Sequence, residues 1–148
     1  MPRLKTKAIP PLPAVIGWRE RVSLPEIGIS RFTAKIDTGA TYCALHATEI
    51  EVHHGTVSFR FEDGDVLGTE LAGRKVITSS NGEKTRRCVI RTPIKIGKHL
   101  IMSEVTLIDR STMKDKMLIG RKFLSGRFVV DPRQSFALSV KKKKRRVK

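Results

Sequence analysis

The 148-residue chain is poor in aromatic residues, cysteine, acidic residues and long apolar runs. Aromatic residues make up 5% of it, which leaves few flat surfaces for stacking the bases of single-stranded nucleic acid. With only two cysteines, Cys43 and Cys88, we expect two buried thiols rather than a stabilising disulfide. No apolar run approaches the ~20 residues that span a bilayer, and the N-terminus lacks the apolar segment of a secretory signal. The sequence therefore predicts a cytoplasmic protein without a membrane partner.

Acidic residues are outnumbered, with 14 Asp and Glu against 30 Lys and Arg, a formal net charge of +16. Seven of the cations lie in the last eight residues, KKKKRRVK, and three more are Arg3, Lys5 and Lys7. The segment 8–140 then holds 20 cations against 14 acids, or +6. A field of this sign favours polyanionic partners, whether nucleic acid, acidic lipid or acidic peptide.

The chain predicts one domain with two basic extensions. Residues 1–13 mix cations with three prolines and should form an extended arm, while like charges should keep 141–148 disordered. The domain then spans 14–140. Alternation of apolar and polar residues predicts strands, with Asn81-Gly82 as a tight hairpin turn and a turn at 62–65. The expected strands are 31–36, 57–61, 74–78, 85–90, 94–96, 101–108, 117–119 and 127–130. One short helix is expected at 121–124, stopped by Gly126. This pattern favours an all-β fold, a small closed or sandwiched barrel.

The motif most indicative of chemistry is Asp37-Thr38-Gly39-Ala40, directly after an alternating strand. A carboxylate at a strand end can be held in a turn, and Gly39 would let the backbone pass close to a substrate. An ordinary Asx-type turn explains the same tetrapeptide when it is taken alone.

A second motif, Met117-Leu118-Ile119-Gly120-Arg121, follows about eighty residues later. Asp-Thr-Gly-Ala after a strand, then a glycine-tipped hairpin, then apolar-apolar-Gly-Arg before a short helix, resembles the order in retropepsin subunits. More narrowly, the chain resembles a bacterial retropepsin-like family catalogued as ATP-dependent zinc proteases. The matching segments are 16–20, 34–40, 44–47, 74–76, 79–82, 89–92, 117–121 and 126–132.

The resemblance implies a closed β barrel with a flap hairpin and one short helix. It also implies an aspartic endopeptidase, with Asp37, Thr38 and Gly39 as the catalytic motif and no cofactor. In that mechanism two aspartates share one proton and activate a water. Because the chain holds one Asp-Thr-Gly, the second carboxylate must come from another copy, which predicts a symmetric homodimer.

The resemblance further suggests a substrate, since the family includes a peptidase that trims α-linked polyglutamate tails from a ribosomal protein. Arginines on the hairpin and beyond it could bind successive glutamates, although a solvated basic strand face explains them equally well. The expected substrate-binding residues are Ala40, Arg74, Asn81, Gly82, Arg86, Arg87, Arg91 and Arg121.

Two positions depart from the pattern of the relatives. Thr41 replaces the acid that pairs with the Gly-Arg arginine in retroviral relatives, so Arg121 could bind Asp131, Asp109 or the substrate. Bacterial relatives often have Arg at the position of Thr41 and Ser at that of Cys43.

Two other functions need to be compared with the sequence. Cys43, His46, His53, His54, Cys88 and His99 offer zinc ligands, but neither HExxH, paired CxxC nor a phosphate-binding GxxxxGK[ST] motif is present, so no metal or ATP is expected. The alternative from another class is a non-enzymatic basic β-barrel module that binds RNA or the ribosome, with 141–148 on the RNA backbone.

Overall fold

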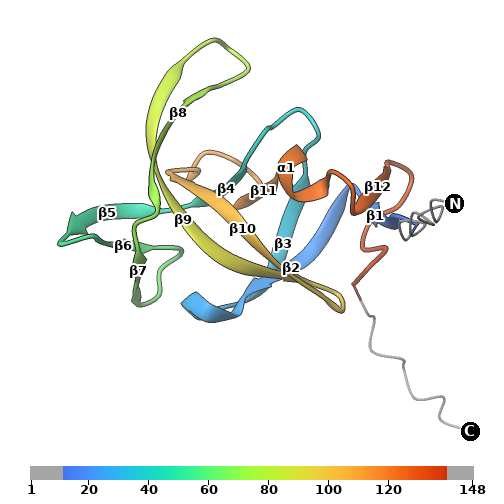
Figure 1. Cartoon of the computed structure of the whole chain (residues 1–148), viewed down its shortest axis with the longest axis horizontal. Coiled ribbons are helices and arrows are strands. Elements are labelled where there is room, and N and C mark those ends of the chain that lie inside the picture. Colours follow the sequence, from blue (N-terminus) through green and yellow to red (C-terminus); the bar gives the residue numbers. More distant parts are fainter. Residues whose placement is uncertain (1–11, 140–148) are drawn as a thin grey trace, which may run out of the picture.

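The computed structural model describes residues 12–139, whose regular secondary structure is almost entirely β-strand (Figure 1). Most of the predicted N-terminal arm and the whole of the tail at 141–148 lie outside these residues. No helix within 12–139 is long and apolar enough to cross a membrane. The elements are β1 (Ala14–Gly17), β2 (Arg19–Leu24), η1 (Pro25–Ile27), β3 (Ile29–Ile36), β4 (Cys43–His46), β5 (Thr48–His53), β6 (Thr56–Arg60), β7 (Val66–Glu70), β8 (Gly73–Thr78), β9 (Lys84–Ile96), β10 (His99–Ile108), β11 (Met117–Ile119), α1 (Arg121–Leu124) and β12 (Phe128–Asp131).

Six strands close into a barrel, which confirms the predicted fold class. They follow the order β10-β4-β11-β3-β2-β9, and antiparallel pairing of β9 with β10 completes the circle. Alternate residues point inward, so Ile90, Ile94 and Ile96 of β9 are fully buried together with Leu45 and Ile119. The barrel therefore has an apolar interior, and the functional groups lie where strands end.

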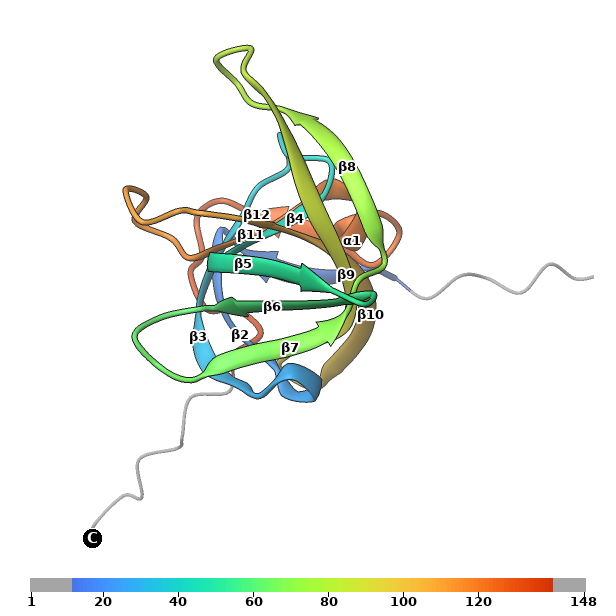
Figure 2. The ribbon, with the colours of Figure 1, turned by 90° about the vertical axis from the view of Figure 1, so that its left-hand side faces the viewer.

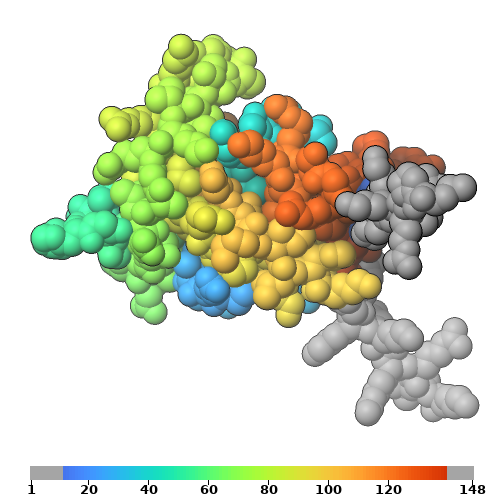
Figure 3. Space-filling view, viewed as in Figure 1, coloured from blue at the N-terminus to red at the C-terminus, as the bar shows by residue number. Residues whose placement is uncertain are grey.

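The long strand β9 was predicted as two separate strands, 85–90 and 94–96. Thr92 and Pro93 interrupt the apolar pattern, but they stay in register with Ser103 and Met102 of β10, so the strand continues. Beyond the barrel, β9 pairs only with β8. The two form a hairpin that projects from the body and ends in an exposed tip (Figures 1, 2 and 3).

A separate three-stranded sheet, β5-β6-β7, lies within residues 48–73, where the sequence shows no motif of the resembled family (Figure 2). Only β6 was predicted, and its Val57 and Phe59 are fully buried. The predicted turn at 62–65 joins β6 to β7. Phe61 packs its ring 4.7 Å from that of Phe32 on β3, and this contact helps to fasten the sheet to the barrel.

The predicted helix is confirmed as α1, and Gly126 follows it with a positive φ of 78°. Such a short helix is not stable by itself, so burial must hold it. Phe123 and Leu124 are buried, and the ring of Phe123 stacks on Phe128 at 5.8 Å.

The buried carboxylate of Glu20 fastens the C-terminal part of the described chain to β2. It accepts hydrogen bonds from the backbone N–H of Gly17 at 2.7 Å, from that of Leu138 and from both the N–H and hydroxyl of Ser139. A fully buried carboxylate is costly unless it is hydrogen-bonded, and these donors offset that cost.

Candidate active site

Asp37 lies immediately after β3 in a tight turn. Its N–H donates to the carbonyl of Ile119 at 2.9 Å, and its carbonyl accepts from Ala40 at 3.2 Å. Its side-chain Oδ1 accepts from the N–H of Gly39 at 2.9 Å. The Asx-type turn is therefore present, but it uses one carboxylate oxygen. Oδ2 has no hydrogen-bond donor among residues 12–139, so it can accept a hydrogen bond from a bound molecule.

Arg121, the first residue of α1, stabilises this turn through its side chain. One of its terminal nitrogens donates to the carbonyls of Thr38 at 3.0 Å and Gly39 at 3.3 Å, and the other donates to the Thr41 hydroxyl at 3.1 Å. Thr41 thus accepts a hydrogen bond at the position where retroviral relatives carry an acid. The guanidinium of Arg121 is a positioning group for the turn.

The prediction that Arg121 could bind Asp131 or Asp109 is wrong, because both carboxylates have nearer donors. Asp131 pairs with Arg133 at 3.2 Å, and that guanidinium holds the pKa of Asp131 far below its usual range. Asp109 accepts from the side chain and N–H of Ser111, which lower its pKa. Within residues 12–139, the side-chain hydrogen bonds of Arg121 go to Thr38, Gly39 and Thr41, and to neither carboxylate.

Gly120 permits the close contact between the Asp37 loop and the start of α1. A Cβ at this position would lie 2.4 Å from the carbonyl oxygen of Tyr42 and 2.9 Å from that of Ala40. The adjacent N–H of Arg121 donates to Ala40 at 2.7 Å. A residue without a side chain is therefore required here.

The hairpin tip differs from the predicted two-residue Asn-Gly turn. The loop spans residues 79–83, and only Gly82 takes a positive φ, 86°. Asn81 instead organises the loop through its side chain, whose Oδ1 accepts from the N–H of Glu83 at 3.1 Å and from the hydroxyl of Ser79. Both predicted tip residues thus shape the hairpin.

Tyr42 links the hairpin base to the Asp37 loop. The ammonium groups of Lys75 on β8 and Lys122 on α1 both donate to its hydroxyl at 3.4 Å, and they lie 4.5 and 4.7 Å from the ring centre. These hydrogen bonds lower the pKa of Tyr42. Lys75 also pairs with Glu104 at 3.0 Å. No pattern in the sequence predicted this cluster.

The structure separates the predicted arginines into two pairs. Residues opposite one another on paired strands share a face of the sheet, and so do alternate residues of one strand. Arg74 and Arg86 therefore lie on one face of the β8–β9 hairpin, and Arg87 and Arg91 lie on the other face. Arg74, Arg86 and Arg91 are exposed. Arg87 is partly buried, and its Nε donates to the Thr85 hydroxyl at 3.0 Å.

Arg110, which the sequence analysis did not identify, lies in the segment between β10 and β11. Burial lowers the pKa of Arg110, and the charges of Asp115 and Asp37 act in the opposite direction. Burial also lowers the pKa of Arg87, and repulsion by Arg110 adds to it. The side chains of Asp37, Arg87 and Arg110 are therefore close enough to interact electrostatically. A cation two residues after the predicted strand 101–108 was the one signal for it in the sequence.

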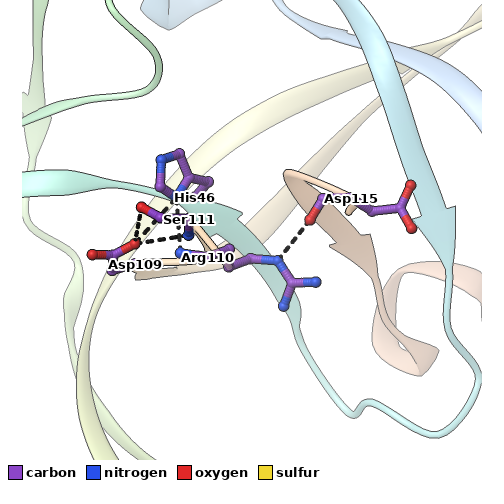
Figure 4. Close-up of polar contacts among 5 residues, drawn as sticks. All are labelled: His46, Asp109, Arg110, Ser111 and Asp115. Carbon is purple, nitrogen blue, oxygen red and sulfur yellow. Dashed lines mark hydrogen bonds and ion pairs between the residues drawn. The ribbon is translucent and has the colours of Figure 1, made fainter. Parts of the chain in front are cut away.

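His46 holds the segment that carries Arg110. Its Nδ1 accepts from the N–H of Arg110 at 2.8 Å, and the guanidinium Nε of Arg110 donates to the carbonyl of Asp115 at 3.0 Å (Figure 4). Burial lowers the pKa of His46, which favours the neutral ring that can accept this bond. Arg110 is thus held at its backbone N–H and at the Nε of its guanidinium group.

Within residues 12–139, His, Cys, Asp and Glu form no group of three that could hold a metal ion. Both cysteines are free thiols; Cys43 is buried as predicted, whereas Cys88 is only partly buried. A cavity of about 800 Å³ lies next to the Arg110 segment, lined partly by His46, Phe61 and Ser111. Asp37 is not among the residues that line this cavity.

A closed barrel, an Asp-Thr-Gly turn fastened by Gly-Arg and a projecting hairpin together define a retropepsin-like protein. Residues 15–141 match the RimB-like family, described as retropepsin-like aspartic endopeptidase RimB, and the chain belongs to this family. That description mentions neither ATP nor zinc, so it does not support the catalogue name ATP-dependent zinc protease.

Curated relatives have a different name, probable alpha-L-glutamate ligase. The protein from Desulfotalea psychrophila is 33% identical over 135 residues, covering 84% of this chain and 29% of the relative. The one from Shewanella halifaxensis is also 33% identical over 135 residues, covering 84% and 30%. The chain thus spans under a third of the length of these relatives. Among solved structures, Lpg0085 from Legionella pneumophila, a protein of unknown function, matches with a TM-score of 0.70 and 25% identity, covering 85% of this chain and 98% of that one.

Proposed function

We propose that the protein is an aspartic endopeptidase in which Asp37 activates the attacking water. The observation that carries this proposal is the free Oδ2 of Asp37, in a turn that Gly120 and Arg121 fix against the end of β3. Membership of the retropepsin-like aspartic endopeptidase family supports it. Since a positioned carboxylate and water need no cofactor, the proposal includes none.

The mechanism needs a second carboxylate, and the sequence contains a single Asp-Thr-Gly. We therefore propose a homodimer in which the Asp37 residues of two copies share one proton at the two-fold axis. One carboxylate takes a proton from water while the other donates a hydrogen bond to the scissile carbonyl. The β8–β9 hairpin would close over the substrate and exclude bulk water.

The proposed substrate is an acidic peptide, in particular an α-linked polyglutamate tail on a protein. Residues 12–139 hold 20 cations against 14 acids, which favours encounter with a polyanion. The curated relatives, named for joining α-L-glutamate, contain a segment similar to this chain, and a peptidase acting on their product is a coherent partner activity. The free thiols suit a reducing compartment, and the proposal includes a cytoplasmic location.

Asp37→Asn is the direct test. On an α-linked oligoglutamate peptide, we expect this variant to lose at least about 100-fold in kcat, because amide cannot act as the base. Asp63→Asn is the matched control, since Asp63 is exposed on the β6–β7 turn, and it should keep the wild-type rate. Unchanged cleavage by Asp37→Asn would remove Asp37 from the mechanism.

The alternative of an RNA- or ribosome-binding module depends on residues 141–148. Deleting them should leave oligoglutamate cleavage intact if the protein is a peptidase. If RNA binding is its function, deletion should reduce RNA affinity and its dependence on salt, while Asp37→Asn changes neither.

A further inference from the structure

The hydroxyl of Tyr42 brings two cations from separate elements to one oxygen atom. Lys75 lies on β8 in the hairpin and Lys122 lies on α1, and each ammonium group donates to this hydroxyl at 3.4 Å. The same two groups lie 4.5 and 4.7 Å from the centre of the Tyr42 ring. Two like charges are therefore held within reach of a single small anion.

Only one of these two cations has an acidic partner in the described chain. Lys75 forms an ion pair with Glu104 at 3.0 Å. The side chain of Lys122 contacts Tyr42 and no acid among residues 12–139. The Tyr42 hydroxyl accepts from both ammonium groups, and its own proton has no acceptor within the same residues. One positive charge thus remains unbalanced at the cluster, beside donors that a ligand can use.

The cluster lies between the hairpin and the Asp37 turn. The hairpin projects from the side of the barrel on which α1 and the loop after β3 lie (Figure 1). Tyr42 follows the turn along the chain, and the N–H of Lys122 donates to the carbonyl of Thr41 at 3.0 Å. Lys75 contributes its ammonium group from the hairpin side. A peptide held between the hairpin and the Asp37 turn would pass beside these donors.

The face of the hairpin that carries Lys75 is the one turned toward the body of the protein. Lys75 contacts Tyr42, and its cross-strand partner Arg87 shares this face. Arg74 and Arg86, two of the predicted substrate-binding residues, lie on the opposite face. They are therefore less suited to contact a peptide beneath the hairpin than the lysine is.

We propose that Tyr42 and Lys122, together with Lys75, bind a side-chain carboxylate of the acidic peptide substrate. This inference deepens the proposed function and rests on it for the identity of the substrate. A carboxylate accepts hydrogen bonds from both ammonium groups and from the phenol, and it neutralises the charge that Glu104 leaves unbalanced. Since Lys75 belongs to the hairpin and Lys122 to the body, the bound carboxylate also joins the two.

Peptide binding in the Asp37→Asn background tests this site without cleavage. The probes are an α-linked oligoglutamate and versions of it with glutamine at one position at a time, and titration calorimetry gives each Kd. We expect glutamine at one particular position to weaken binding at least about fivefold, and Lys122→Gln to abolish that difference. At every other position, Lys122→Gln should leave the preference for glutamate within about twofold of its starting value. Coupling to a single position distinguishes a site from the general attraction of a basic protein.

Three variants serve as comparisons. Lys98→Gln removes the same charge from an exposed residue in the β9–β10 turn, so it should show no coupling to any one position. Tyr42→Phe keeps the ring but loses the O–H, and it should weaken the preference at the same position as Lys122→Gln. Lys122→Arg keeps the charge and should retain more of that preference than Lys122→Gln does. Unfolding midpoints check that each variant folds, and Lys75→Gln replaces Lys122→Gln if the latter does not.

The outcomes separate this inference from the proposed function. If folded Lys122→Gln keeps the full preference for glutamate at every position, the inference is overturned, whether or not the wild type cleaves the peptide. If the coupling is present but the wild type does not cleave oligoglutamate, the proposed function fails and the carboxylate site stands. Should Asp37→Asn still cleave the peptide, the same position-by-position comparison is made on kcat/KM, with the same single coupling expected.

Discussion

Replacing Gly120 by Ala tests whether the Asp37 turn depends on close backbone contact with the β11–α1 junction. The added Cβ would lie 2.4 Å from the carbonyl oxygen of Tyr42, 2.6 Å from its carbon and 2.9 Å from the carbonyl oxygen of Ala40. All three are backbone atoms, so no side-chain rotation relieves the clash. Restoring ordinary contact requires the loop to move by roughly 1 Å.

That movement also lengthens the 2.7 Å hydrogen bond from Arg121 to Ala40. We expect Gly120→Ala to lower the free energy of unfolding by about 3 kcal/mol, the upper range for overpacking. For a chain of this size, this corresponds to a drop of roughly 10 °C in Tm. Oligoglutamate cleavage should decline as well, since the displaced loop carries Asp37.

Urea denaturation followed by circular dichroism measures the effect, with Gly64→Ala as the control. A Cβ at Gly64 meets nothing within 4 Å, and its φ lies outside the left-handed region. The control should therefore stay within about 0.5 kcal/mol of wild type. If Gly120→Ala were as stable as Gly64→Ala, the loop would not depend on this contact, and the geometry argued for Asp37 would lose its support.

Two further predictions concern buried polar groups. Glu20→Ala leaves the N–H donors of Gly17 and of the C-terminal segment without an acceptor, so it should lower the free energy of unfolding by about 3 kcal/mol. The control is Glu26→Ala, which should cost little because Glu26 is exposed. Equal unfolding midpoints for the two variants would refute the prediction. Burial lowers the folded-state pKa of His46 below 6.5, so the unfolded chain binds more protons than the folded chain as the pH falls. His46 therefore contributes stability above pH 6.5, and this contribution is lost as the pH falls through the folded-state pKa. His46→Asn keeps an acceptor for Arg110, and its unfolding midpoint should fall less than that of wild type between about pH 7 and pH 5; parallel profiles would contradict the prediction.

Local signals predicted the elements that bear the candidate catalytic motif. Alternation up to Ile36 located β3 and so placed Asp37 at its end, and the Met117–Ile119 run with its Gly-Arg ending predicted β11 and α1. By contrast, β7 was missed because its residues remain exposed or only partly buried, which leaves no clear apolar face.

Contacts that depend on barrel closure could not be predicted in the same way. Arg110 and Asp37 are far apart in sequence, and they approach only because β3, β11, β4 and β10 are neighbours in the sheet. Glutamate is usually found at the surface, so the sequence does not indicate that Glu20 is buried. Its burial becomes favourable only when the segment ending at Ser139 packs against β2 and donates hydrogen bonds to its carboxylate. The sequence therefore predicted the acid, but not the groups that surround it.

The central claim, that two copies of Asp37 form one catalytic centre, is tested most directly by mixing wild-type and Asp37→Asn chains at fixed total concentration. After subunit exchange, equal parts should give about one quarter of the full oligoglutamate-cleaving rate, because activity follows the square of the wild-type fraction. A rate of about one half, in proportion to the wild-type fraction, would show that each copy acts alone and would contradict the account.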